Sequence, residues 1–185
     1  SGSNNVLVGY AAGFGSQGAG PDFTGNHNTY IGYRAGEYST TAEKSVAIGN
    51  KALHAQLRAS EAVAIGAEAL SRSTSDLTYG TIAIGAYAMQ ESIGNTDYSV
   101  AIGYKALQGQ YNSDPQGVFI GGFAGMAASS SFNSVMIGYK AGQYGGVSNA
   151  GSSQTFVGWY AGQNATGSYN TFLGASAGKG GTTSA

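Results

Sequence analysis

The stretch "SVAIGYKAL", residues 99–107, decides the fold class. It contains three apolar residues (VAI, 100–102), which end at Gly103, and an alanine, Ala106, three residues after that glycine. Successive side chains of a strand point to opposite faces, so this segment is apolar on both faces. Both faces of the predicted strand must therefore be covered.

The same pattern of apolar residue, variable residue, Ile, Val or Leu, Gly, two variable residues and Ala occurs ten times. Its glycines are spaced 16 to 23 residues apart, which indicates a constant core with loops of variable length. They are Gly9, Gly32, Gly49, Gly66, Gly85, Gly103, Gly121, Gly138, Gly158 and Gly174. A short strand that ends on a glycine corner is typical of one coil of a β-solenoid, because glycine permits positive φ and close packing there. We therefore expect an all-β parallel β-solenoid of about ten coils.

The two faces of each strand receive different assignments. The outer positions, such as Val46 and Ile48, are expected to stack in the chain's own narrow core, and the middle position is expected to face the other way. Because the middle position is also apolar throughout, we expect it to be buried against other subunits of a homo-oligomer. The predicted trimer interface is Leu7, Tyr30, Ala47, Ala64, Ala83, Ala101, Phe119, Met136, Phe156 and Phe172.

Two other readings of the pattern are weaker. Helical packing needs apolar residues at i, i+3, i+4 and i+7, and 32 glycines at repeat intervals argue against it. Amyloid-like low complexity fits the Gly, Ser and Ala content, but the strict Gly-x-x-Ala register favours a specified fold.

Two groups of repeats resemble known families. The units SVAIGNKAL (45–53), AVAIGAEAL (62–70) and SVAIGYKAL (99–107) resemble the head repeats of trimeric autotransporter adhesins, the YadA-like heads. The units NTYIGYRAG (28–36), SVMIGYKAG (134–142) and NTFLGASAG (170–178) are similar to repeats of phage tail fibres and bacterial fibre proteins. The resemblance implies left-handed parallel β-rolls in a homotrimer, intertwined or side by side. It covers residues 4–178, leaving 1–3 as a tag remnant or cut point and 179–185 as a flexible tail.

Composition excludes several kinds of partner. The formal charge is −1 and only 9% of residues are charged, so neither nucleic acid nor a membrane surface is an expected partner. No apolar run approaches the roughly 20 residues of a membrane span. The chain has no cysteine, which excludes disulfides and thiolate metal sites.

Signals for chemistry are weak. The segment 13–18 matches G-x-G-x-x-G, but Pro21 and its polar surroundings indicate a loop (14–27) rather than the helix that a dinucleotide site needs. His27 and His54 have no metal-ligand spacing, so no metal or cofactor is expected. Carboxylates occur singly. We predict no enzymatic activity, with a surface-polysaccharide depolymerase as an open alternative, because carboxylates from distant coils can form an acid and base pair.

Aromatic residues are the remaining signal, with 13 Tyr, 7 Phe and one Trp. Tyr10, Tyr33, Tyr104 and Tyr139 each follow a repeat glycine, and we interpret them as a packing ladder. The last two repeats are richest in rings and amides, which suit sugar recognition. The predicted ligand-binding residues are Tyr144, Trp159, Tyr160, Asn164 and Tyr169. The alternative is that these rings only cap the end of the solenoid.

Together these features predict a non-enzymatic fibre tip domain, extracellular on a virion tail fibre or a bacterial surface. It would attach to a glycan or protein receptor on a target cell. The alternative is a structural spacer within a fibre shaft.

Overall fold

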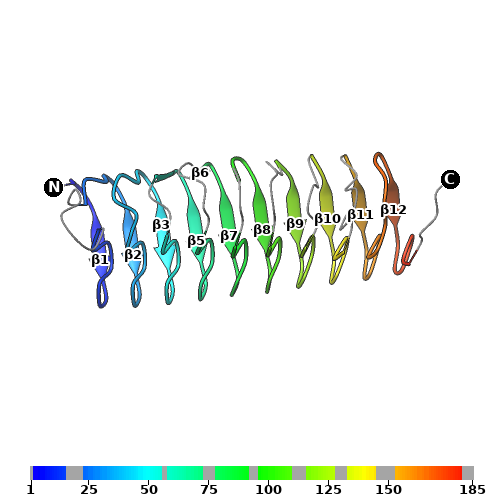
Figure 1. Ribbon diagram of the computed structural model, residues 1–185, viewed down its shortest axis with the longest axis horizontal. Helices are drawn as coiled ribbons and strands as arrows, with labels where there is room; N and C mark the ends of the chain where they lie inside the picture. Colours follow the sequence, from blue (N-terminus) through cyan, green and yellow to red (C-terminus); the bar gives the residue numbers. More distant parts are fainter. Residues whose placement is uncertain are drawn as a thin grey trace.

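The computed structural model is an all-β parallel β-solenoid, as expected (Figure 1). It describes residues 2–15, 23–55, 58–72, 78–91, 96–109, 116–127, 133–144 and 153–180. Within these ranges there is no helix.

Ten three-residue strands form one parallel sheet in chain order. They are β1 (Val6–Val8), β2 (Thr29–Ile31), β3 (Val46–Ile48), β5 (Val63–Ile65), β7 (Ile82–Ile84), β8 (Val100–Ile102), β9 (Val118–Ile120), β10 (Val135–Ile137), β11 (Thr155–Val157) and β12 (Thr171–Leu173). A second sheet pairs β4 (Ala59–Ser60) with β6 (Thr78–Tyr79). Figure 1 shows the strands side by side along the long axis, with β1 and β12 at opposite ends.

The strands pair without any shift between repeats. Val46 is opposite Val63, Ala47 opposite Ala64, and Ile48 opposite Ile65. The middle residues of all ten strands therefore form one row, and the flanking residues form two rows on the opposite face.

The assignment of these two faces was wrong. The middle residues are buried inside the single chain, whereas the flanking residues are partly exposed on its outside. The middle residues that are 0% or 1% exposed are Tyr30, Ala47, Ala64, Ala83, Ala101, Phe119, Met136 and Phe156. Leu7 and Phe172 hold the same position in the two end strands and remain partly exposed. A three-residue strand sends one side chain to one face and two to the other, and the narrow interior takes the single row.

The interior is filled by complementary pairs. Where the middle residue is alanine, the fourth residue after the repeat glycine is large and buried: Leu53, Leu70, Met89 and Leu107. Where the middle residue is large, that fourth position is glycine, as in Tyr30 with Gly36 and Phe119 with Gly125. A Cβ added at either glycine would collide with the opposing ring. Each repeat thus places one large side chain in the same interior space, either from the middle of the strand or from the fourth position after the repeat glycine.

Candidate recognition surface

The two residues that follow the repeat glycine lie on the outside of each corner, and all of them except Gly122 carry a side chain. The second residue after the repeat glycine has positive φ in all ten repeats, although it is never glycine. These residues are Ala11, Arg34, Lys51, Glu68, Tyr87, Lys105, Phe123, Lys140, Tyr160 and Ser176.

Hydrogen bonds between repeats hold this left-handed conformation. The backbone N–H of Lys105 donates to the carbonyl of Ala86 at 3.0 Å, and that of Tyr160 donates to the carbonyl of Tyr139 at 2.9 Å. The same bond recurs from repeat to repeat. It helps to offset the cost of about 1–3 kcal/mol that a non-glycine residue has in the left-handed conformation. The side chains at the first and second positions after the repeat glycines therefore form two fixed rows along the solenoid, the first of which is interrupted at Gly122.

Six aromatic residues from these two rows form a continuous series of ring contacts, which we call the aromatic ladder: Tyr87, Tyr104, Phe123, Tyr139, Trp159 and Tyr160. Five of these rings form a series in the order Tyr87, Tyr104, Phe123, Tyr139 and Tyr160. The centroids of neighbouring rings in this series are 6.0, 5.3, 5.8 and 5.8 Å apart, and each pair is edge to face. The indole of Trp159 lies 4.2 Å from the ring of Tyr160. Edge-to-face contacts are favourable for aromatic pairs, so the ladder is a pre-ordered surface.

The rings of the ladder are also open to solvent. Tyr104 is 46% exposed, Tyr139 42% and Trp159 54%. Ring faces that are fixed by their neighbours and still exposed can stack on a ligand at little entropic cost.

Three ammonium groups lie over this ladder. The Nζ of Lys105 is 5.4 Å from the Tyr104 centroid, and the Nζ of Lys140 is 5.4 Å from that of Tyr139. The Nζ of Lys179 is 4.1 Å from the Tyr160 centroid. A hydrogen bond with Tyr160 is the main cause that raises the pKa of Lys140 above its ordinary value, so this lysine is charged at neutral pH. The surface therefore combines exposed rings with fixed positive charge.

The structure unites residues that the sequence reasoning had divided. Trp159 and Tyr160, predicted to bind ligand, lie in the same ladder as Tyr104 and Tyr139, interpreted as packing residues. Tyr10 and Tyr33 stack on each other at 5.5 Å near the other end.

Three predicted residues lie outside the ladder. Tyr144 is exposed, and its backbone N–H donates to the carbonyl of Gln163 at 2.8 Å. Tyr169 is 81% exposed, and Asn164 is also exposed. None of the three takes part in the ring contacts that define the ladder.

Sequence reasoning missed Tyr87 and Phe123. Both hold the second position after the glycine, whereas Tyr104 and Tyr139 hold the first. The sequence signal that could have revealed them is that, in successive repeats, the aromatic residue alternates between the first and the second position after the repeat glycine. Only the geometry of the corner shows that these two positions are neighbours across repeats.

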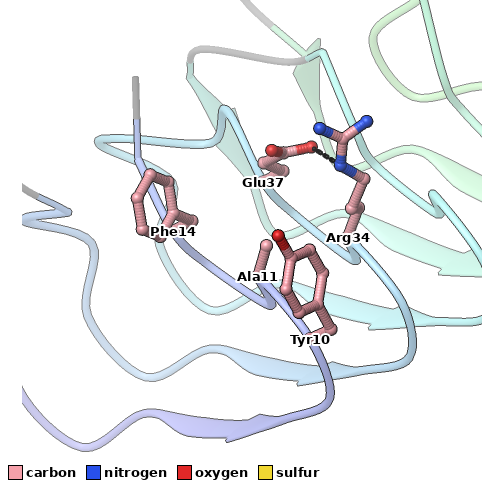
Figure 2. A pocket seen from close by; sticks show the side chains of 5 residues that line it. All are labelled: Tyr10, Ala11, Phe14, Arg34 and Glu37. Carbon is pink, nitrogen blue, oxygen red and sulfur yellow. Dashed lines mark ion pairs between the residues drawn. The ribbon is translucent and has the colours of Figure 1, made fainter. Parts of the chain in front are cut away.

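A small cavity of about 220 Å³ lies near the N-terminal end, lined by Tyr10, Ala11, Phe14, Arg34 and Glu37 (Figure 2). The Nε of Arg34 is 3.0 Å from Oε2 of Glu37. The same oxygen is 2.8 Å from Nε2 of His54, and the Glu37 side chain is 2% exposed. The carboxylate is thus satisfied within the chain. The cavity is also smaller than the roughly 300–1,000 Å³ of most ligand sites.

His54 illustrates a contact that sequence spacing does not reveal. Its carboxylate partner, Glu37, is 17 residues away in the chain. Burial lowers the pKa of His54, and the hydrogen bond to Glu37 partly opposes that shift.

The described ranges contain no cluster of three His, Cys, Asp or Glu side chains able to hold a metal. The glycine-rich segment 13–18 and the loop 14–27 fall partly on residues 16–22, which lie outside the described residues. In the described part of the chain, no helix has the length and hydropathy needed to cross a membrane.

Comparison with known proteins gives no match to a family model, a curated protein or a solved structure.

Proposed function

We propose that this chain is a non-enzymatic attachment domain of an extracellular fibre, on a virion tail or a bacterial surface. Its aromatic ladder would contact a glycan or another receptor on the target cell. The observation that carries the proposal is the row of half-exposed rings, ordered by edge-to-face contacts and flanked by lysine ammonium groups. Rings of this kind provide apolar faces for sugar rings, and the tyrosine hydroxyls provide polar tips.

Assembly forms the second part of the proposal. The outward face of the ten-stranded sheet carries two rows of mostly Val and Ile, including Val8, Ile31 and Ile48. An apolar face of this length is unusual on a monomer. We propose that further copies of this chain cover it, in a parallel homotrimer of left-handed rolls with about ten coils each. The regular repeat supports copies of this chain as the covering partner. Parallel copies in the same register would present identical rows of Val and Ile to one another.

Trimer formation would also strengthen attachment. Three aromatic ladders on one particle bind a surface together, so weak individual contacts gain avidity.

A spacer in a fibre shaft is the second candidate. One observation favours it: the ladder rings contact one another and thus stabilise the solenoid without any ligand. The two candidates differ in whether the isolated domain binds anything.

The test is binding of the oligomeric protein to a glycan array and to target cells. The variant Tyr139→Ala/Trp159→Ala removes two exposed rings of the ladder, and Tyr98→Ala removes an exposed ring that contacts Tyr79 instead. We expect the ladder variant to lose binding and the control to retain it, with unchanged circular dichroism for both. Retained binding in the ladder variant would move the site elsewhere. No binding by the wild-type protein would favour the spacer, and cleavage of a glycan would overturn the non-enzymatic assignment.

A further inference from the structure

We infer that the aromatic ladder takes an acidic, unbranched polysaccharide whose chain runs along the solenoid axis. This inference rests on the proposed attachment function and names the class of ligand for the same surface. Three features carry it: the linear extent of the ladder, the lysine ammonium groups over its rings, and the lack of ion pairs between those lysines and carboxylates of the described residues.

The ladder is long in one direction. Its rings run from Tyr87, after β7, to Tyr160, after β11. Parallel strands lie about 4.8 Å apart, so these four steps cover about 19 Å. A surface of this length suits several consecutive units of a polymer better than one terminal sugar.

The positive charges lie along the ladder. Lys105 and Lys140 hold the same position, the second after the repeat glycine, following β8 and β10, and two strands correspond to about 9.6 Å along the axis. Lys179, five residues after Gly174, places its Nζ over Tyr160, the ring whose centroid is also 5.3 Å from the Nζ of Lys140. This row of ammonium groups is complementary to a polymer that carries repeated negative groups.

Among the residues that the structure describes, no carboxylate forms an ion pair with these three lysines. The ion pairs of the described residues all join side chains between residues 34 and 91. After Glu91, the one acidic side chain in the described ranges is Asp97, which accepts the backbone N–H of Tyr79 in β6 at 2.6 Å. Within the described ranges, an acidic ligand therefore meets three ammonium groups that are not paired with a carboxylate.

The rings distinguish a polysaccharide from a purely electrostatic partner. The sequence after residue 91 contains three lysines and no arginine, which is a sparse charge for a phosphate backbone. The ladder presents exposed rings, Tyr104, Tyr139 and Trp159, on which sugar rings can stack, and the lysines then select for acidic units.

The experiment measures binding of the whole protein to immobilised hyaluronan and alginate, to their carboxyl-reduced neutral forms and to single-stranded DNA of similar length. We expect the acidic polymers to bind at least tenfold more tightly than their reduced forms, with affinity that falls as salt is raised. Lys105→Gln/Lys140→Gln should remove this preference without loss of folding. Lys44→Gln, which removes an exposed lysine paired with Glu61, should leave it unchanged.

Each outcome has a separate meaning. Equal binding of the acidic and reduced polymers, or DNA binding as tight as that of the acidic polymers, would overturn the inference. Binding to target cells would still stand in that case, so the proposed function would survive. A preference for the acidic polymers that persists in the double lysine variant would also overturn it, because the charges would then lie elsewhere.

Discussion

The ring of Tyr30 occupies the space that a side chain at Gly36 would need. In the next repeat the arrangement is reversed, because Ala47 leaves that space to Leu53. The pairing of large with small holds in all ten repeats: wherever the middle residue is large the partner is glycine, and wherever it is alanine the partner is Leu or Met. The interior of the solenoid therefore has one constant volume for each repeat, and two kinds of sequence fill it.

This complementarity predicts a strong coupling between Phe119 and Gly125. Phe119→Ala should leave a cavity that costs about 3–5 kcal/mol of unfolding free energy. Gly125→Leu should overpack the same space and cost about 1–3 kcal/mol or more. The double variant reproduces the Ala101 and Leu107 pair of the preceding repeat, so it should recover most of the loss. Urea unfolding of all four proteins measures the coupling.

The backbone does not prevent this exchange. Gly125 has φ +60°, and Leu107 at the equivalent position has φ +51°. Additive effects of the two substitutions would contradict the complementary filling of the interior.

Ala101 and Ile102 test which face of the sheet is internal. Ala101→Glu should unfold the chain, because a carboxylate buried without a partner costs several kcal/mol. Ile102→Glu lies on the outward face and should keep the β signal in circular dichroism, while sedimentation should show loss of the proposed trimer. A folded Ala101→Glu monomer would restore the original assignment of the faces.

Alanine variants at Gly103 and Gly174 separate the steric cost of a side chain at the corner from its conformational cost. A Cβ there would lie 2.6 Å from the carbonyl atoms of Gly121, and φ is +134°. At Gly174, φ is +122° but nothing lies within 4 Å of the added atom. Both alanine variants should lose about 1–3 kcal/mol from the backbone alone, and Gly103→Ala should lose clearly more. Equal unfolding midpoints would mean that the close approach of neighbouring corners contributes nothing.

Asn28 connects adjacent repeats through buried hydrogen bonds. Its Nδ2 donates to the carbonyl of Ala42 at 2.7 Å, and its Oδ1 accepts the N–H of Ser45 at 2.9 Å. Asn28→Ala should leave both backbone groups unsatisfied, at about 1–3 kcal/mol each.

Asn5→Ala is the matched control, since Asn5 makes the same two kinds of bond in a less buried place. It should cost less in thermal or urea unfolding. A larger loss for Asn5 than for Asn28 would contradict the role of burial.

His54 predicts a pH dependence of stability. Burial lowers its pKa in the folded chain below the ordinary value of 6.5. Below pH 6.5 the unfolded chain therefore binds more protons than the folded one, and stability falls as the pH is lowered toward the folded pKa. Above pH 6.5 this contribution is constant.

The variant His54→Gln keeps a donor for Glu37 and removes the titration. The difference in unfolding free energy between the wild type and this variant should therefore change between pH 7 and pH 5. A constant difference across that range would contradict the prediction.

Much of this protein could be read from its residues. The ten Gly-x-x-Ala units placed all ten strands of the main sheet, the corners and the parallel order, because each short apolar segment needs neighbours on both sides. The alternation of large and small partners, such as Tyr30 with Gly36, was also present in the sequence, although it acquires meaning only once the two positions share one space.

The tertiary structure decided which face is inside and which residues are neighbours across repeats. Strand alternation groups Val46 with Ile48 and separates them from Ala47, but this grouping is the same whichever face is buried. The narrow interior and its partner Leu53 place Ala47 inside. The ladder likewise depends on the left-handed backbone after each corner, which brings first and second positions of successive repeats into contact. Sequence determined the repeat, and the geometry between repeats determined its surface.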